Sequence, residues 1–396
     1  MVIDRPRMAI TACGFCAFLD LYAPQAVLPQ LTEAFHITPA EAGATVSIST
    51  LAVAVSAPLV GMLTERWNRK TTIVAAALLL LIPTILLVLA GSLNEIMVWR
   101  FLQGVFLPAI FSSAVAYTNE EWQPSDAADI MGLYIAGSAV GGFSGRFVTA
   151  LMAEHFGWRA GFLALSAVSV ACALLIWAWL PAPRSTRQAA AQPKGMVWKH
   201  LRNPSLQATY AAGFAVLFSM VATFTYINFH LAAAPYLLGP AQLGMIFMVY
   251  LIGAAITPVS GSLIRRLGRR WAMQLAVGTS ILGMLLTLHP SVLVILAGLA
   301  LFVTGVFLAQ SAAMGFVGQS VEHGKGTAVG LYLFFYYVGG SFGGVVPGWL
   351  VWQKGGWSGC VVLVILTIGF AGLLAWRAWA PKRQGCGAAT CSCAAE

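Results

Sequence analysis

Twelve long apolar runs are the feature of this sequence that most restricts its fold. They lie near residues 8–31, 43–64, 71–91, 96–117, 128–152, 158–180, 206–232, 241–264, 271–289, 291–317, 327–352 and 357–379. Each run is close to or longer than the ~20 apolar residues that a helix needs to cross a bilayer. The runs are continuously apolar, whereas the strands of a membrane β-barrel alternate between apolar and polar residues. We therefore predict an all-α membrane protein with twelve transmembrane helices.

Composition excludes a soluble enzyme that carries only a membrane anchor. Hydrophobic residues make up 59% of the 396 residues and charged residues 9%, whereas soluble domains carry about 25% charged residues. Arg5 and Arg7 precede the first run, as in a signal peptide, but this run is long and contains Asp20, so we interpret it as a retained helix. No nucleotide-binding loop, catalytic triad or metal-catalysis motif is apparent in the sequence. We expect neither an enzyme nor a bound cofactor.

The distribution of basic residues predicts the orientation in the membrane. Eighteen of the 22 Lys and Arg residues lie in the N-terminus, in the loops that follow even-numbered runs, or in the C-terminus. The other side carries only Arg159 and Lys354. The positive-inside rule then places both termini in the cytoplasm. The net charge of +9 is explained by these loops and does not indicate a nucleic-acid partner.

The chain divides into two similar halves. A polar stretch with several prolines, 181–205, separates an N-terminal six-helix bundle at 1–180 from a C-terminal one at 206–380, and a cysteine-containing tail follows at 381–396. Residues 61–70 align with 261–270, 132 with 330, 141–142 with 339–340, and 157–158 with 356–357, at offsets of 198 to 200. Because the matched segments lie on the same membrane side, we infer a parallel repeat. Such repeats bind substrate between the halves, near the bilayer midplane.

Three motifs resemble signatures of the major facilitator superfamily. The basic loop 61–70 resembles the pattern G-x-L-x-D-R-x-G-R-R, with Glu65 in place of Asp and Asn68 in place of Gly. Residues 100–104 resemble R-x-x-Q-G, and 137–142 resemble the antiporter pattern G-P-x-x-G-G, with Ser138 in place of Pro. Residues 21–25 and 141–146 are similar to the bacterial drug and sugar efflux branch. The resemblance implies a multi-pass transporter of the bacterial inner membrane that exchanges drugs or other small organic compounds for protons.

Two sets of residues take their expected roles from this resemblance. One set would form a cytoplasmic gate, although its basic members also anchor the loops to anionic lipid; it comprises Gly61, Glu65, Arg66, Arg69, Lys70, Gly261, Arg265 and Arg269. The other set packs helices closely, and the resemblance implies that it also serves exchange transport; it comprises Gly137, Gly141, Gly142 and Gly145.

Charged residues inside the runs are the candidates for proton coupling. Asp20 is the acid that lies inside an apolar run, where a charge is costly and needs a cavity or a partner. It would either bind and release a proton during transport or form a structural ion pair with Arg100 or Arg146. The resemblance of residues 100–104 makes Arg100 a proton-coupling partner. Arg146 is a further candidate for coupling, for gating or for binding an anion. For both arginines the alternative is a side chain that extends to the membrane surface or donates hydrogen bonds to carbonyl groups.

Polar and aromatic residues in or near the runs are expected to line the substrate cavity, although each alone is as readily explained by a helix–helix contact. They are Tyr22, Gln25, Gln103, Tyr226, Asn228, His230, Gln310, Tyr332, Tyr336 and Tyr337. Because aromatic residues outnumber charges, we expect an amphipathic organic substrate and not a phosphate ester.

The cysteines give a weak indication of soft-metal chemistry. Cys13 and Cys16 share a helix face with Asp20. The tail carries Cys386, Cys391 and Cys393, whose spacing matches no zinc signature. We expect no resident metal, although a thiol-reactive metal or metalloid is an alternative substrate.

The sequence therefore predicts a monomeric secondary transporter that exports a small organic compound in exchange for protons. Its partners would be that compound, protons and the lipid bilayer. Proton-coupled uptake and facilitated diffusion are alternatives within transport. A membrane sensor or scaffold with the same fold is the alternative outside transport.

Overall fold

A computed structural model describes residues 4–64, 67–183, 195–321 and 323–379. These residues form helices and no strand, which confirms the predicted all-α fold. The helices that precede the linker are α1 (Arg5–Leu21), η1 (Ala23–Val27), α2 (Leu28–Phe35), α3 (Pro39–Thr64), α4 (Arg69–Leu89), α5 (Leu93–Glu121), α6 (Pro124–Phe156) and α7 (Trp158–Trp179). Those that follow it are α8 (Met196–Leu201), α9 (Pro204–Ala232), α10 (Pro240–Ile246), α11 (Val249–Leu267), α12 (Arg269–Leu286), α13 (Val292–Ser320), α14 (Lys325–Pro347), η2 (Gly348–Trp352) and α15 (Gln353–Ala378).

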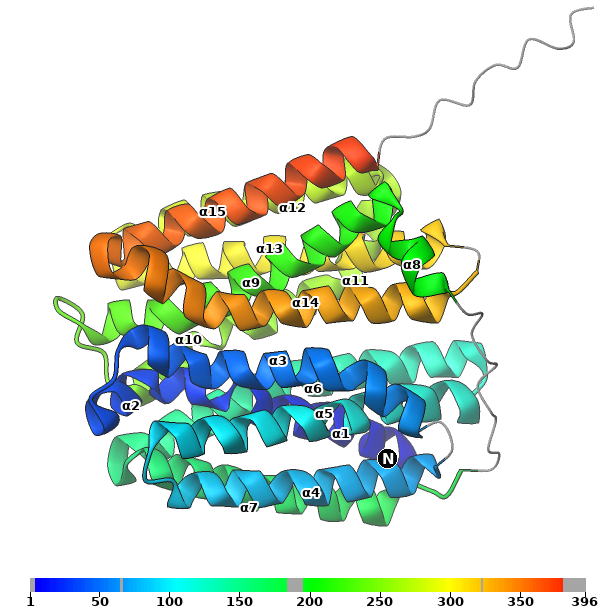
Figure 1. Ribbon diagram of the computed structural model, residues 1–396, viewed down its shortest axis with the longest axis horizontal. Coiled ribbons are helices and arrows are strands. Elements are labelled where there is room, and N and C mark those ends of the chain that lie inside the picture. The colour runs from blue at the N-terminus through cyan, green and yellow to red at the C-terminus, as the bar shows by residue number, and fades with distance from the viewer. Residues whose placement is uncertain (1–3, 65–66, 184–194, 322, 380–396) are drawn as a thin grey trace, which may run out of the picture.

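The helices form two bundles that lie side by side (Figure 1). The first half contains α1 to α7 and the second half α9 to α15, and α3 packs against α14 where the two halves meet. The short helix α8 lies at one end of the molecule, which we call the linker end, and α2 and α10 lie at the other, which we call the far end.

The helices correspond to the twelve predicted runs. Within the described residues, seven helical stretches are long and apolar enough to cross a membrane, or nine if each bent pair counts as one span. One of the seven, Lys325–Ala378, contains both α14 and α15. Two further runs correspond to α6 and α12.

Two predicted spans are broken helices. The first run is not one helix, because α1 ends at Leu21 and the chain continues through η1 into α2 with a bend of 40°. Pro24 lies at the start of η1, and a proline cannot donate the backbone hydrogen bond that would continue α1. The run 241–264 is likewise divided, since Phe247 and Met248 separate α10 from α11. Within the predicted linker, the described residues include the short helix α8.

Glycines bring α1 and α6 into close contact. Gly137, Gly141 and Gly145 lie on the face of α6 that packs on α1, where an added Cβ would collide with a carbonyl oxygen of α1 at every position. The second half repeats this contact between α14 and α9 at Gly339 and Gly343. These two contacts fix the positions of α1 and α9, which carry many of the polar residues described below.

Candidate functional site

Asp20 lies fully buried in the last turn of α1, in contact with two hydroxyl groups. Its carboxylate accepts a hydrogen bond from the Ser169 hydroxyl of α7 at 3.0 Å and one from the Thr84 hydroxyl of α4 at 3.4 Å. Within the described part of the chain, no basic side chain forms an ion pair with Asp20. The alternative of an ion pair with Arg100 or Arg146 is therefore not realised in this conformation.

Arg100 of α5 is fully buried and binds backbone carbonyls instead of a carboxylate. Its Nη1 donates to the carbonyl oxygen of Asp20 at 2.9 Å, its Nη2 donates to that of Leu21, and its Nε donates to that of Thr45 at 3.1 Å. The first two carbonyls belong to the last turn of α1, where a helix leaves its carbonyl groups without internal partners. Arg100 therefore caps the C-terminus of α1 at the point where that helix breaks.

Gln103 joins Arg100 to the hydroxyl that contacts Asp20. Its Oε1 accepts from Arg100 Nη1 and its Nε2 donates to Thr84 Oγ1 at 2.7 Å. We call Asp20, Thr84, Gln103, Ser169 and Arg100 the Asp20 cluster. Sequence analysis placed Gln103 in the substrate cavity and missed Thr84 and Ser169, because hydroxyl residues are common in apolar helices and only packing shows which of them faces the acid.

Arg146 of α6 lies among three aromatic rings, and we call this arrangement the Arg146 cage. Its guanidinium carbon is 4.9 Å from the ring centre of Tyr22 and 4.7 Å from those of Phe247 and Tyr250. The residue is 1% exposed. Phe247 lies in the break between α10 and α11, and Tyr22 lies at the break after α1, so both broken helices meet at this cation. The rings partly stabilise the buried charge through cation–π attraction.

Arg146 is incompletely paired. Its Nε donates to Oε1 of Gln25 at 2.9 Å and its Nη1 donates to the carbonyl oxygen of Gly142 at 2.7 Å. Its Nη2 donates to no acceptor in the described residues, and no carboxylate of those residues lies within ion-pair distance. A buried cation without an anion is unusual, because an unpaired charge is costly away from water.

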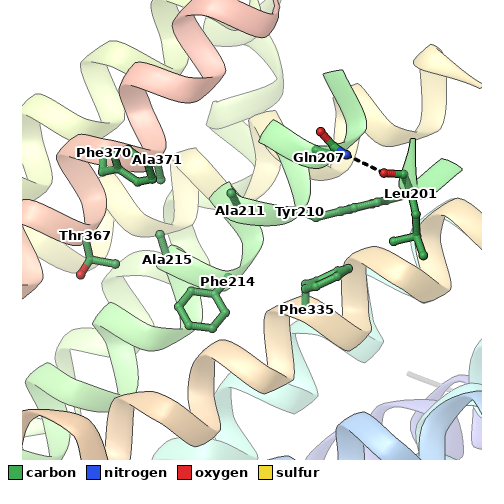
Figure 2. Close-up of a pocket in the computed structure, with 10 residues that line it drawn as sticks. All are labelled: Leu201, Gln207, Tyr210, Ala211, Phe214, Ala215, Phe335, Thr367, Phe370 and Ala371. Atoms are coloured by element: carbon green, nitrogen blue, oxygen red, sulfur yellow. Dashed lines mark hydrogen bonds between the residues drawn. The ribbon is translucent and has the colours of Figure 1, made fainter. Parts of the chain in front are cut away.

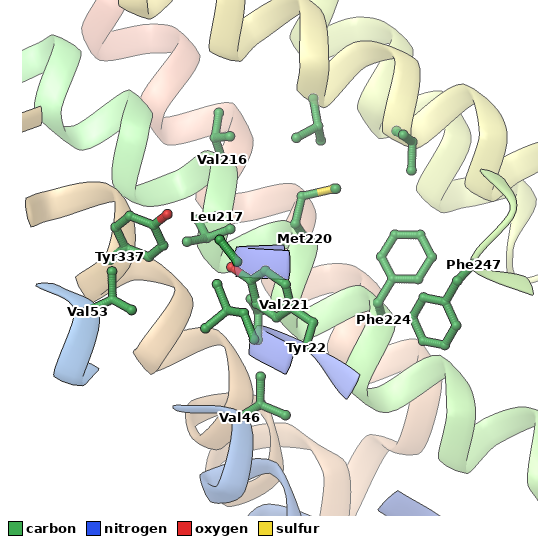
Figure 3. Close-up of a cluster of buried hydrophobic side chains, with 14 of the residues drawn as sticks. Tyr22, Val46, Val53, Val216, Leu217, Met220, Val221, Phe224, Phe247 and Tyr337 are labelled. Carbon is green, nitrogen blue, oxygen red and sulfur yellow. The ribbon is translucent and has the colours of Figure 1, made fainter. Parts of the chain in front are cut away.

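The Arg146 cage lies on the boundary between the two halves. Gln25 of η1 donates to the Thr225 hydroxyl of α9 at 3.3 Å, and Asn228 of α9 donates to the Gln25 carbonyl at 2.9 Å. Oδ1 of Asn228 is buried without a hydrogen-bond partner. Figure 3 shows the apolar side chains that surround this boundary, with Tyr22 from the first half and Phe224 and Phe247 from the second.

The other residues predicted to line the cavity are distributed along the second half. Tyr226 donates to the Gly344 carbonyl at 2.8 Å, and Tyr332 donates to Gln310 at 2.6 Å. Tyr336 packs on the ring of Tyr332.

Two more of the predicted cavity residues, His230 and Tyr337, contact residues that were not predicted to line the cavity. His230 stacks on Trp357 with ring centres 5.8 Å apart and is not part of the Arg146 cage. Tyr337 stacks on Phe111 of the first half, with ring centres 6.3 Å apart.

At the far end, the halves are in direct backbone contact. Gly43, near the start of α3, lies against the backbone of Gly344 near the end of α14, so that neither position has room for a Cβ. The carboxylate of Glu154 on α6 accepts a hydrogen bond of 2.7 Å from the backbone N–H of Ala241 on α10. The described conformation is therefore closed at this end.

At the linker end, the predicted gate is only partly described. Arg69 donates to the two carboxylate oxygens of Glu120 at 2.9 and 3.3 Å, which ties the start of α4 to the end of α5. Both helices belong to the first half, so this ion pair does not join the halves. Arg265 is exposed at the end of α11. Glu65 and Arg66 lie outside the described residues, and nothing is described of the surroundings of Gly61.

Cysteines and cavities lie apart from the Arg146 cage. Cys13 and Cys16 of α1 are buried free cysteines, and Cys172 of α7, which packs on α1, is a partly buried one. In the described ranges, no three His, Cys, Asp or Glu residues converge as metal ligands, and the tail cysteines lie beyond those ranges.

A pocket of about 520 Å³ lies between α9, α14 and α15 (Figure 2). Its lining is almost entirely apolar and includes Tyr210 stacked on Phe335. By the repeat, Phe335 occupies the position that corresponds to Gly137 in the first half. The pocket contains none of the predicted site residues.

Comparison with known proteins decides the family. The profile of the Major Facilitator Superfamily matches residues 10–344 and 228–385, which together span nearly the whole chain. The chain belongs to the major facilitator superfamily. The inner membrane transport protein YnfM of Escherichia coli (strain K12) is 34% identical over 94% of this chain and 90% of its own length. The MFS-type transporter YybF of Bacillus subtilis (strain 168) is 32% identical over 97% of this chain and 96% of its own.

Solved structures agree with this assignment. A bacterial homologue of the human lysosomal transporter Spinster, in an inward-facing and occupied conformation, matches with a TM-score of 0.79 at 15% identity, over 94% of this chain and 96% of that one. As a member of the major facilitator superfamily, the protein is a multi-pass membrane protein and a secondary transporter, not an enzyme. Transporters of this superfamily bind small-molecule substrates within the bilayer.

Proposed function

We propose that this transporter exports a small organic compound from the bacterial cytoplasm in exchange for protons, and that Asp20 carries the proton. The observation that supports this role most strongly is the environment of Asp20, a fully buried carboxyl group that has hydroxyl partners and, among the described residues, no cation within ion-pair distance. A carboxyl group in apolar surroundings is more stable with a proton, whereas one in contact with water at neutral pH is more stable ionised. A cycle that alternately buries and hydrates Asp20 would therefore load and release a proton.

The contacts of Asp20 provide a route to the boundary between the halves. Its carboxylate connects through Thr84 and Gln103 to Arg100, which caps the end of α1. The next residues form η1, where Gln25 contacts Arg146 and α9. A change in protonation at Asp20 would alter the hydrogen bonds that hold the break in α1. Because η1 touches the second half, that change would bias how the halves pack.

The proposed direction rests on the orientation of the chain and on its resemblance to an efflux branch. The excess of basic residues in the linker and termini supports cytoplasmic placement of the linker end. The relative YnfM is named as an inner membrane protein, which supports the same membrane for this chain. With that orientation, the closed far end faces outward. The similarity of residues 21–25 and 141–146 to the bacterial drug and sugar efflux branch supports export over uptake.

A tolerance screen followed by a vesicle assay tests the function. A deletion strain and the complemented strain are compared on lipophilic cations, antibiotics, aromatic acids and arsenite. Compounds that the complemented strain tolerates better are then added to everted membrane vesicles with an acidic lumen. Quenching of an acridine dye reports the acidity of the lumen. We expect such a compound to restore the fluorescence, because its entry into the lumen releases protons.

Two variants make the vesicle assay specific. Asp20→Asn keeps the size of the side chain but cannot titrate, so it should abolish the recovery of fluorescence. Asp126→Asn makes the same change at an exposed acid on α6 and should behave like the wild type. If the fluorescence recovers in Asp20→Asn vesicles to the wild-type extent, the proposed role of this residue is contradicted. If the complemented strain tolerates a compound that releases no protons from the vesicles, the proposed exchange is contradicted.

A further inference from the structure

Among the described residues, Arg146 is the buried arginine that has neither a counter-ion nor a nearly complete set of acceptors, so it still has capacity to bind a ligand. The buried arginines among the described residues are Arg69, Arg100 and Arg146. Arg69 forms its ion pair with Glu120, and Arg100 is occupied by three backbone carbonyls and one side-chain amide. Two N–H groups of Arg146 have acceptors, whereas a guanidinium group carries five. The remaining N–H groups, on a side chain that is 1% exposed, have neither an acceptor nor a counter-ion among those residues.

The partners of Arg146 divide between the two halves. Gln25, Gly142 and Tyr22 belong to the first half, as Arg146 itself does, whereas Phe247 and Tyr250 belong to the second. A movement of the halves away from each other would leave the two hydrogen bonds of Arg146, which are both made within the first half. It would remove the rings of Phe247 and Tyr250. The guanidinium would then face the space between the halves, oriented by its hydrogen bonds and without a counter-ion.

We propose that the anionic group of the transported compound binds Arg146, and that the compound is an amphipathic organic monoanion, namely a carboxylic acid with an apolar or aromatic body. A planar carboxylate can take two N–H groups of a guanidinium in parallel. A phosphate dianion would need a second cation, and Arg100 is already occupied. The rings of Tyr22, Phe247 and Tyr250 suit an apolar body. This inference rests on the proposed export function only for the direction in which the acid moves.

Binding can be tested without knowledge of the natural substrate. The probes are 1-naphthoate and benzoate, each compared with its uncharged amide, 1-naphthamide and benzamide, and they are titrated into the purified full-length protein at pH 7. Intrinsic tryptophan fluorescence or thermal stabilisation reports binding. We expect each acid to bind at least about tenfold more tightly than its amide, since a hydrogen bond to a charged group contributes about 1.5–3 kcal/mol, which corresponds to a factor of about 10 to 150.

Variants assign this preference to Arg146. Arg146→Gln should bind the acid and the amide equally, whereas Arg146→Lys should keep a smaller preference because it keeps the charge. Arg159→Gln is the matched control, because Arg159 also packs on an aromatic ring and donates to backbone carbonyls but lies at the start of α7. It should retain the wild-type preference. Should Arg146→Gln fail to fold, the wild-type comparison and Arg146→Lys decide the question.

The outcomes separate this inference from the proposed function. Equal binding of acid and amide by the wild type, absence of binding by both acids, or a preference that survives in Arg146→Gln would overturn it. None of these results depends on a pH gradient. Binding of 1-naphthoate and 1-naphthamide is measured without transport, so a failure of proton exchange would leave the preference for the acid intact.

Discussion

Replacing Gly141 by alanine should force α1 and α6 apart. An added Cβ at this position would lie 2.7 Å from the Cα atom and 2.8 Å from the carbonyl carbon of Phe15, and still closer to its carbonyl oxygen. Carbon atoms in favourable contact lie about 3.5–4.0 Å apart, so the helices would have to separate by about 1 Å. The obstructing atoms are backbone, which cannot rotate away as a side chain can. Overpacking of this kind costs about 1–3 kcal/mol.

Gly132→Ala is the matched control on the same helix. A Cβ at Gly132 would meet no atom within 4 Å. Alanine favours a helix over glycine by about 1 kcal/mol, so this variant should be neutral or slightly more stable than the wild type. The same gain in propensity acts at Gly141, where it offsets only part of the steric cost.

Equilibrium unfolding in mixed micelles, followed by tryptophan fluorescence, measures the difference. We expect Gly141→Ala to have a lower free energy of unfolding than Gly132→Ala by about 1–3 kcal/mol, which is the steric cost alone, because the propensity gain acts at both positions and cancels. If the two variants unfold within about 0.5 kcal/mol of each other, a margin typical of surface substitutions, the close contact between α1 and α6 is not maintained in solution.

Two other contacts and the proposed membrane orientation lead to predictions of their own. A double-mutant cycle on Arg69 and Glu120, with each replaced by alanine, should give a coupling energy of about 1–3 kcal/mol in the same unfolding assay, because this pair is largely buried; a value near zero would contradict it. Arg100→Lys should lower the free energy of unfolding by about 2–4 kcal/mol, since a point-like ammonium cannot reach the three carbonyls that the guanidinium binds, and wild-type stability would refute the capping role. In a background without native cysteines, a single cysteine at position 194 should react with an impermeant reagent only from the cytoplasmic side, and labelling only from the periplasm would reverse the proposed orientation.

Much of the fold could be predicted because it follows from local features of the sequence, namely the length of the apolar runs and the spacing of the glycines. Membrane spans follow from run length, since the hydrocarbon core sets the length of a helix. The glycines of α6 were expected to mark a close helix contact, and their spacing of four residues places them on one face. Asp20 was identified as an acid in an apolar interior by its position in the first run alone.

The helix breaks could not be predicted in the same way. Pro24 indicates that α1 cannot continue, but the break after Leu21 also depends on Arg100, which is distant in sequence and binds the carbonyl groups that α1 leaves free. For Arg100 and Arg146 the sequence leaves open both charged partners and hydrogen bonds to carbonyls; in the structure their bound donors reach carbonyls and amides, and aromatic rings surround Arg146. Every residue has a backbone carbonyl, and amide and aromatic side chains are common, so the sequence does not indicate which of these groups will lie near a given arginine.

The neighbours of each functional residue were the least predictable part. Thr84 and Ser169 contact Asp20 only because α4 and α7 pack on α1 at the required rotation. Phe247 and Tyr250 reach Arg146 across the boundary between the halves, from a broken helix that the sequence presents as one continuous run. Contacts of this kind depend on how the halves pack, which no local pattern encodes.

Transport by purified protein in proteoliposomes tests the proton-carrying role of Asp20 most directly. The lumen is made more acidic than the bath, and accumulation of the compound found in the tolerance screen is followed with wild-type protein, with Asp20→Asn and with protein-free liposomes. We expect the wild type to concentrate the compound in the lumen as protons leave. Asp20→Asn should equilibrate the compound across the membrane without concentrating it. Accumulation by Asp20→Asn to the wild-type level would show that another group carries the proton and would contradict the proposed coupling through Asp20.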